Sequence, residues 1–174
     1  MDSWEGGGAV VAAHLSAYCG HTTYRSAETS PVIKRRYVQK AFTHKVFQTV
    51  QAGVFDGRYA KPGTCDLVVA ADFGHGLFAD TSLADDAKWL ALTCQSNSAN
   101  WGFNLVTRWP RANYVVVDEQ EAQLAFQCRD AAENLVERLR VHMGAEVACV
   151  TVGHQGAVFA DADGVHTVPA LSER

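Results

Sequence analysis

Short apolar runs, each closed by polar turn residues, set the pattern of this chain. The first covers Asp66 to Ala71 and is followed by the turn residues DFGHGL, and similar runs cover Tyr114 to Val117 and Val147 to Val152. Runs of this length between turns are typical of strands that helices bury on both faces of a parallel sheet. The pattern therefore predicts an α/β fold with a mostly parallel sheet.

A helical pattern separates the second and third runs. Asp130 to Met143 carries its apolar residues on one stripe and is followed by Gly144, which is typical of a helix C-terminus. Asp118 and Glu121 have the D-x-x-E form of a capping box, so a helix is expected to begin directly after the second run. Strand, helix and strand in succession imply neighbouring parallel strands.

Each run ends near a residue that could take part in binding, namely Asp72, Asp118 or Thr151. In open α/β sheets, ligands bind at the carboxyl ends of the parallel strands, which share one edge. We therefore expect these three side chains to line one crevice. Gly74 and Gly76 would let the backbone turn there and approach a ligand or phosphate closely.

Gly6-Gly7-Gly8 precedes a helix candidate of small residues, Ala9 to Tyr18, which is expected to end at Gly20. Backbone amides at the start of such a helix can bind a polar or anionic ligand. A glycine triplet is by itself a weak signal of a site.

Residues 31–38 and 45–51 mix apolar and polar positions and predict an antiparallel strand pair with one solvated face. The first strand carries the basic triplet Lys34-Arg35-Arg36. Such a triplet fits either a solvated strand edge or a clamp for a phosphate or sugar phosphate, and the sequence leaves both interpretations open.

Side-chain amides gather after another short apolar stretch, Trp89 to Leu92. Gln95, Asn97, Asn100 and Asn104 lie within one turn-rich region. Amides both donate and accept hydrogen bonds, which suits hydroxyl-rich ligands. Asparagine also commonly turns and caps the backbone, so a purely structural role is an equal alternative.

Composition and charge narrow the classes of function. The chain has 174 residues, of which 48% are apolar, so it suits one domain of ordinary size. Its formal net charge is −4 without a long basic run, which argues against nucleic acid or an anionic membrane as a partner. The absence of a long apolar segment or a secretory signal predicts a cytoplasmic protein. The five scattered cysteines form no C-x-x-C pair and are expected to be buried thiols.

Three segments together carry a resemblance to a known family. DFGHGL, then LALTCQSNSANWGFNLVTRWPRANYVVVDEQEAQLA, then VTVGHQGAVF, in this order and spacing, resemble the ribokinase-like (PfkB-type) carbohydrate kinases. The branch they resemble most is related to the sugar-kinase half of bifunctional heptose-phosphate kinase/nucleotidyltransferases. The resemblance implies a three-layer fold over residues 1–174 as a single domain, with a small antiparallel lid around residues 31–51. It also implies ATP-dependent phosphorylation of a sugar or sugar phosphate with ATP and Mg²⁺.

The resemblance divides the candidate site residues between two ligands. Those expected to bind the sugar or sugar phosphate are Gly7, Gly8, Lys34, Arg36, Asp72, Gly74, Gly76, Asn97, Asn100 and Asn104. Those expected to bind the nucleotide are Asp118, Glu121, Thr151, Gly153 and Gly156, with Glu121 also serving the Mg²⁺ ion. A homodimer through the lid strands is expected as well, because an uncovered strand pair exposes edge hydrogen bonds.

The chain departs from the family pattern at positions that matter for chemistry. The family's G-A-G-D motif, which supplies the catalytic base and the amides that hold the transferring phosphate, would follow a hairpin ending near Val168, and this sequence contains no such motif. Ala13 stands where the family usually has an asparagine that contacts sugar, and Asp118 replaces the asparagine of an N-x-x-E motif. Because phosphoryl transfer depends on positioned charge, we expect this chain, as a fragment or a decayed paralogue, to be inactive by itself.

Two other functions stay open. One is a catalytically dead module that binds a sugar phosphate or a nucleotide. The other is a flavodoxin-like or hydrolase-like α/β domain that uses Asp72 as nucleophile or metal ligand, by analogy of strand-end acids. No G-x-S-x-G, P-loop or H-E-x-x-H motif supports the latter.

Overall fold

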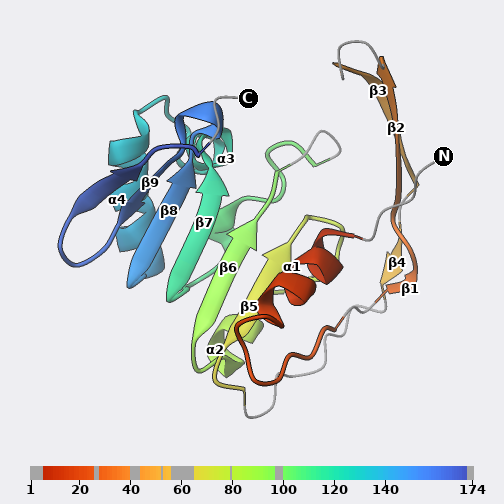
Figure 1. Ribbon diagram of the computed structural model, residues 1–174, viewed down its shortest axis with the longest axis horizontal. Helices are drawn as coiled ribbons and strands as arrows, with labels where there is room; N and C mark the ends of the chain where they lie inside the picture. Colours follow the sequence, from red (N-terminus) through yellow and green to blue (C-terminus); the bar gives the residue numbers. More distant parts are fainter. Residues whose placement is uncertain are drawn as a thin grey trace. The chain divides into compact units, whose positions relative to one another are not determined.

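The computed structural model describes residues 6–25, 28–39, 44–51, 53–55, 65–78, 80–96 and 100–171. The chain divides into two compact units, one of residues 1–60 and 75–79 and the other of residues 61–74 and 80–174. The larger unit is built on a mostly parallel sheet, and the described residues of the smaller unit form one helix and two antiparallel strand pairs (Figure 1).

Six strands form the sheet of the larger unit, in the spatial order β10-β9-β8-β7-β6-β5. The strands are β5 (Val68–Asp72), β6 (Leu90–Cys94), β7 (Tyr114–Asp118), β8 (Val147–Thr151), β9 (Ala157–Ala160) and β10 (Val165–Val168). β5 to β8 are parallel, and their arrows point the same way in Figure 1, whereas β9 and β10 pair antiparallel. The mostly parallel α/β sheet expected from the apolar runs is confirmed.

The helix that joins β7 to the following segment begins where the capping box predicts. In α3 (Glu119–Phe126) the Glu121 amide donates to Asp118 Oδ1 over 2.7 Å, and the Asp118 amide donates to Glu121 Oε2 over 2.9 Å. These two bonds satisfy backbone groups that a helix start otherwise leaves unpaired. The acidic pair is thus the reason that the chain turns into a helix directly after β7.

The second helix of this unit is α4 (Ala132–Met143), two residues shorter at its start than the sequence predicts. Its N-cap residue Ala131 is extended and offers no side-chain cap, while Asp130 instead pairs with Arg138 over 3.0 Å. Gly144 ends the helix with a φ of 57°, a left-handed conformation that glycine adopts without strain. Short helical segments complete the unit: α2 (Leu83–Asp86), η1 (Val106–Arg108) and η2 (Gly153–Gln155).

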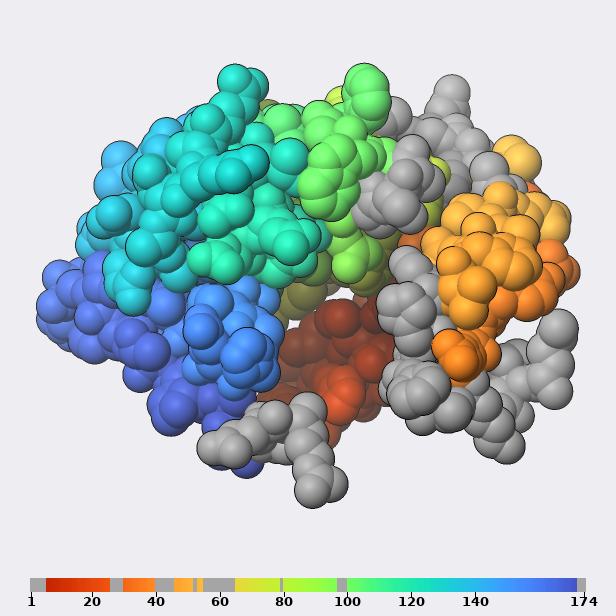
Figure 2. Space-filling model, turned by 90° about the horizontal axis from the view of Figure 1, so that it is seen from above, coloured from red at the N-terminus to blue at the C-terminus, as the bar shows by residue number. Residues whose placement is uncertain are grey.

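Burial alternates along the parallel strands. Leu90, Leu92 and Cys94 of β6 are buried, as are Val115 and Val117 of β7, whereas the residues between them are only half-buried. α3 and α4 lie together on one side of the sheet in Figures 1 and 2. The prediction that these strands are buried on both faces therefore holds fully for one face and in part for the other. One face carries the core and the other is partly exposed, because alternate side chains of a strand point to opposite faces.

The five cysteines are free thiols with different surroundings. Cys94 is buried and Cys65 is exposed, while Cys19, Cys128 and Cys149 are half-buried. The expectation of uniformly buried thiols is therefore correct only for Cys94, which occupies an inward position of β6.

The smaller unit contains the expected strand pair. β2 (Ile33–Gln39) and β3 (His44–Gln51) are antiparallel, within two residues of the predicted bounds. A second pair, β1 (Glu28–Ser30) with β4 (Val54–Phe55), was not evident from the sequence because both strands are very short.

The glycine-rich start of the chain forms α1 (Gly7–Leu15), which begins two residues earlier and ends three residues earlier than predicted. Gly6 is its N-cap, so Gly7 and Gly8 lie in its first turn. Across the described residues, no helix has the length and apolar character needed to cross a membrane.

Candidate functional site

The carboxyl ends of the parallel strands meet at one edge of the sheet, as the sequence predicts. Asp72 pairs in register with Cys94, and Asp118 pairs in register with Thr151. Their exposure differs, because Asp72 is 3% exposed whereas Asp118 and Thr151 face solvent. The shared edge is confirmed, and a single crevice lined by all three residues stays a prediction.

The Asp72 carboxylate is surrounded by donors from the protein itself. These are the Gly74 amide (3.0 Å) and Asn104 Nδ2 (3.2 Å) at Oδ1, with Trp109 Nε1 (3.1 Å), Arg108 Nη1 (3.5 Å) and Cys94 Sγ (3.6 Å) at Oδ2. A buried carboxylate is tolerated when it is paired and hydrogen-bonded in this way. Burial, and then the charge of Asp72, raise the pKa of the Cys94 thiol, which therefore stays protonated and donates.

Asn104 is likewise enclosed, with an exposure of 4%. Its Oδ1 accepts from Arg108 Nη1 over 2.8 Å, and its Nδ2 also reaches the carbonyl oxygen of Gln95 at 3.2 Å. These contacts give Asp72 and Asn104 a positioning role, since together they fix the segment that contains η1 to the ends of β5 and β6. A direct contact of either residue with substrate stays a prediction.

Gly74 adopts a positive φ of 67°, as a turn glycine should. Asn100 Nδ2 donates to its carbonyl oxygen over 3.3 Å, and a Cβ added to Gly74 would overlap the Asn100 side chain. The space that was expected to admit a ligand at Gly74 is therefore taken by Asn100. Gly76 also has a positive φ, of 95°, whereas Asn97 lies outside the described residues.

Glu121 links the ends of β6 and β7. Its Oε1 accepts the Ser96 amide over 3.0 Å and its Oε2 accepts the Asp118 amide over 2.9 Å. Burial is the largest cause that raises the pKa of the Glu121 carboxyl above its ordinary value. Ser96 Oγ in turn donates to the carbonyl oxygen of Asn104 over 2.9 Å, so the polar network runs continuously from β5 to β7.

These contacts bear on the magnesium ion that the resemblance implies. Mg²⁺ requires oxygen ligands in a near-octahedral arrangement. Both Glu121 oxygens accept backbone amides and the residue is 8% exposed, so its role as a direct ligand stays a prediction. In the part of the chain that the structure describes, no group of three His, Cys, Asp or Glu residues could hold a metal ion.

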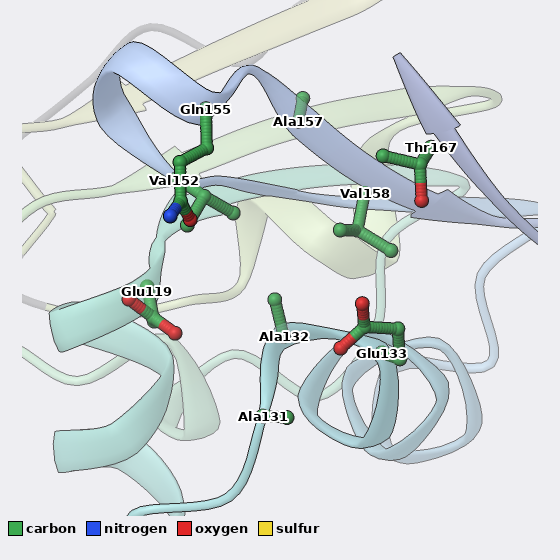
Figure 3. Close-up of a pocket in the computed structure, with 9 residues that line it drawn as sticks. All are labelled: Glu119, Ala131, Ala132, Glu133, Val152, Gln155, Ala157, Val158 and Thr167. Carbon is green, nitrogen blue, oxygen red and sulfur yellow. The ribbon is translucent and has the colours of Figure 1, made fainter. Parts of the chain in front are cut away.

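A pocket of about 240 Å³ opens beside the end of β8 (Figure 3). The starts of α3 and α4 form one wall, and η2, β9 and β10 form the opposite wall. The lining residues are Glu119, Ala131, Ala132, Glu133, Val152, Gln155, Ala157, Val158 and Thr167. Apolar methyl groups thus form much of the wall, and two carboxylates, an amide and the Thr167 hydroxyl supply its polar side-chain groups.

The pocket adjoins the segment predicted to bind a nucleotide, but none of the five residues predicted for this role lines it. Val152, Gln155 and Ala157 line it and alternate in the chain with Thr151, Gly153 and Gly156. The contribution of α4 was missed, because the alanines at its start carry no polar signal. The uncapped N-terminus of this helix could be recognised only from the fold.

Gly153 and Gly156 differ in what surrounds them. Both have a positive φ, of 56° and 110° respectively. A Cβ added at Gly153 would meet no atom within 4 Å, whereas a Cβ at Gly156 would overlap the carbonyl oxygen of Val168 and lie 2.7 Å from the Ala170 amide. Open space therefore remains at Gly153, and the chain's own segment 168–170 fills the space at Gly156.

The remaining predicted residues belong to the smaller unit. Lys34 and Arg36 lie on the same face of β2, where Arg36 Nε donates to Gln48 Oε1 over 3.0 Å. Burial, and then the positive charge of Arg36, lower the pKa of the Lys34 ammonium. In α1, a Cβ added at Gly8 would lie 3.0 Å from the Tyr24 ring. The absence of a side chain at Gly8 therefore lets the Tyr24 ring, which belongs to the same unit, pack closely on the helix.

The chain matches no protein-family model and no curated protein. Its fold does match solved structures. A PfkB protein from Polaromonas sp. JS666 matches with a TM-score of 0.58 over 95% of this chain and 63% of its own, at 14% identity. A ribokinase from Thermotoga maritima matches with a TM-score of 0.56 over 80% of this chain and 48% of its own, at 12% identity. A nucleoside kinase from Burkholderia thailandensis, solved in complex with inosine, matches with a TM-score of 0.50 over 76% and 45%, at 18% identity.

The chain therefore has the ribokinase-like fold, with its mostly parallel sheet and small antiparallel sheet, and it spans about half to just under two thirds of these structures. At such identities the likeness establishes the fold alone. Activity and ligands have to be argued from the site.

Proposed function

We propose that this chain is the core of a PfkB-type carbohydrate kinase, which transfers a phosphoryl group from ATP to a hydroxyl group of a sugar or sugar phosphate. The observation that carries the proposal is the pocket beside β8, at the position where the T-x-G-x-x-G pattern from Thr151 to Gly156 predicts a nucleotide. The ribokinase-like fold supports it. The resemblance of residues 95–104 favours the branch related to heptose-phosphate kinases.

The pocket suits the base of a nucleotide. Its volume of about 240 Å³ is below the roughly 300–1,000 Å³ of sites for drug-sized ligands, so it fits one ring system. Ala132 and Val158 offer apolar surface to the ring faces, while Glu133 and Gln155 offer polar groups to its edge. The carboxylates of Glu119 and Glu133 would repel phosphates, which would extend instead toward the open space at Gly153.

The charge of the lid strands supports a phosphorylated sugar as the acceptor. Residues 29–55 contain no Asp or Glu, although the whole chain has a net charge of −4. Their basic residues are Lys34, Arg35, Arg36, Lys40 and Lys45. Charge-assisted hydrogen bonds from Lys34 and Arg36 would hold a phosphate. The lowered pKa of the Lys34 ammonium would rise again when the anion binds, because a nearby negative charge favours the charged form.

A bound Mg²⁺ ion would neutralise charge on the phosphates of ATP. The resemblance assigns the ion to Glu121, whose oxygens also accept the two backbone amides that hold the ends of β6 and β7 together. Asp118 is the exposed carboxylate nearest to Glu121 in the chain.

The isolated 174-residue polypeptide is proposed to bind ligands without transferring phosphate, because these residues contain no G-A-G-D motif. A catalytically dead sugar-phosphate or nucleotide-binding module is the second candidate function, and the same observation favours it. A coupled ADP-release assay over sugars and sugar phosphates is expected to show no turnover. Turnover by this polypeptide would contradict the expectation.

The proposed homodimer would use the lid strands. Tyr37 and Phe47 stack with ring centroids 4.1 Å apart, on the face of β2 and β3 opposite Lys34 and Arg36. Both rings are about half exposed. Lys34 and Arg36 place two positive charges on one face of β2, whereas Arg35 alone among the basic residues of β2 lies on the Tyr37 face. Repulsion between like charges is therefore smaller on the Tyr37 face, which is the one that a second copy would cover. A cytoplasmic location and the absence of a nucleic-acid partner stay predictions from the sequence.

Nucleotide binding is the test of the proposed function. Thr167 of β10 lines the pocket, and Val165 lies two residues away on the same face of the strand, outside it. Thr167→Trp fills the pocket and is expected to weaken ADP binding at least about 10-fold in isothermal titration calorimetry, whereas the matched variant Val165→Trp leaves it unchanged. No ADP binding by the unmodified chain, or equal affinity in both variants, would exclude this pocket as the nucleotide site.

A further inference from the structure

Two aromatic side chains are exposed at the carboxyl edge of the sheet, on the loop that follows β6. Trp101 is 55% exposed and Phe103 is 91% exposed. Large apolar side chains that face solvent on a loop next to a ligand-binding edge commonly mark an interaction site. The buried network of Asp72 makes no use of either ring.

The backbone holds these rings on a tight turn. The Phe103 amide donates to the Asn100 carbonyl oxygen over 2.8 Å, and Gly102 has a φ of 78°, which is the geometry of a type II turn. A Cβ added at Gly102 would meet no atom within 4 Å. Glycine is therefore required here by the backbone conformation and not by a lack of space.

Both ends of the turn are anchored to the strand ends. Asn100 donates to the Gly74 carbonyl oxygen, and Asn104 is enclosed by Asp72, Arg108 and the carbonyl group of Gln95. A loop that is fixed in this way loses little conformational entropy when a ligand binds to its tip. The backbone that carries the exposed rings is thus held in place before any ligand arrives.

We infer that Trp101 and Phe103 form an aromatic shelf for the sugar ring of the acceptor substrate. A sugar ring has a face of C–H groups, which packs on an aromatic ring, and a rim of hydroxyl groups, which pairs with amides. Gln95 is exposed and supplies an amide at the start of the same loop. This inference rests on the proposed carbohydrate kinase function. It adds to that function the side chains that recognise the sugar ring of the substrate and not its phosphate group.

Saturation-transfer difference NMR, with irradiation of the protein's aromatic protons, tests the shelf. The probes are D-glucose 6-phosphate and sedoheptulose 7-phosphate, and glycerol 3-phosphate, which carries C–H protons but no sugar ring, is the ring-free comparison. Trp101→Ala is expected to weaken the binding of the sugar phosphates about 3- to 10-fold, as expected for one lost aromatic contact. Trp101→Phe keeps a ring and is expected to restore most of the affinity. The matched control Tyr18→Ala removes another aromatic residue, 88% exposed, and is expected to change nothing.

The outcomes separate the shelf from the proposed function. Equal sugar-phosphate binding by Trp101→Ala and the unmodified chain would overturn the shelf and leave the proposed function intact. No binding of either sugar phosphate by the unmodified chain would overturn both. A variant that keeps its sugar affinity but loses self-association in light scattering would show that the rings form a protein interface instead.

Discussion

The ends of β5 and β8 lie on the same edge of one sheet, yet the first is closed by the protein's own side chains and the second is open. At β5, five donors surround the Asp72 carboxylate. At β8, the exposed Thr151 and the open space at Gly153 adjoin a pocket of about 240 Å³. A polar residue at a strand end thus indicates a ligand site only where no neighbouring segment has already satisfied it.

The largest expected effect comes from opening the closed end. Asp72→Ala leaves Arg108, Trp109 and Asn104 without their shared acceptor, so the free energy of unfolding should fall by about 3–5 kcal/mol in urea denaturation. Asp66→Ala is the matched control, because its carboxylate is fully exposed beside Lys88 and should contribute almost nothing. A loss below about 1 kcal/mol for Asp72→Ala would mean that this end of the sheet is not held by the network.

A second comparison uses the two glycines after β8. Gly153→Ala places an alanine in a left-handed conformation, which costs about 1–2 kcal/mol of stability. Gly156→Ala should cost more, by about 1–3 kcal/mol, because its Cβ would overlap the Val168 carbonyl oxygen. Urea denaturation of both variants measures the difference. Equal losses would show that the segment 168–170 does not pack on Gly156.

The smallest effect concerns pH. Burial raises the pKa of the Glu121 carboxyl, so the folded state holds this proton more tightly than the unfolded state. The resulting stabilisation is present below the ordinary glutamate pKa of 4.5 and is lost as the pH rises through the raised value. As the pH falls from 7 to 4.5, the free energy of unfolding of the unmodified chain should therefore rise relative to that of Glu121→Gln. A stability difference that stays constant with pH, measured by urea denaturation, would contradict the raised pKa.

The architecture was predictable because its signals are local. Apolar runs place β7 and β8, the D-x-x-E pair places the start of α3, and Gly144 places the end of α4. Each signal acts through neighbouring backbone groups, so the sequence pattern contains the relevant partners. The alternation of burial in β6 and β7 was not predictable in this way, because residues of both faces are apolar.

The site was less predictable because its contacts are distant in the chain. Asp72 has the features of a ligand-binding acid until Asn104, 32 residues later, and Trp109, 37 residues later, are seen to satisfy it. The pocket is likewise lined by Ala131 and Ala132, whose side chains carry no polar groups. They contribute to it because they lie at the N-terminus of α4. Sequence patterns identified the strand-end residues, and the fold decides which of them remain accessible.

The most direct measurement of this account is a titration of the ¹⁵N-labelled chain with ADP, followed by amide chemical shifts. The open end predicts shifts at Ala132, Glu133, Gly153 and Gln155, with Gly74 unchanged within the closed network. Shifts centred on Gly74 instead, or no shift at millimolar ADP, would contradict the assignment of the nucleotide site to the end of β8.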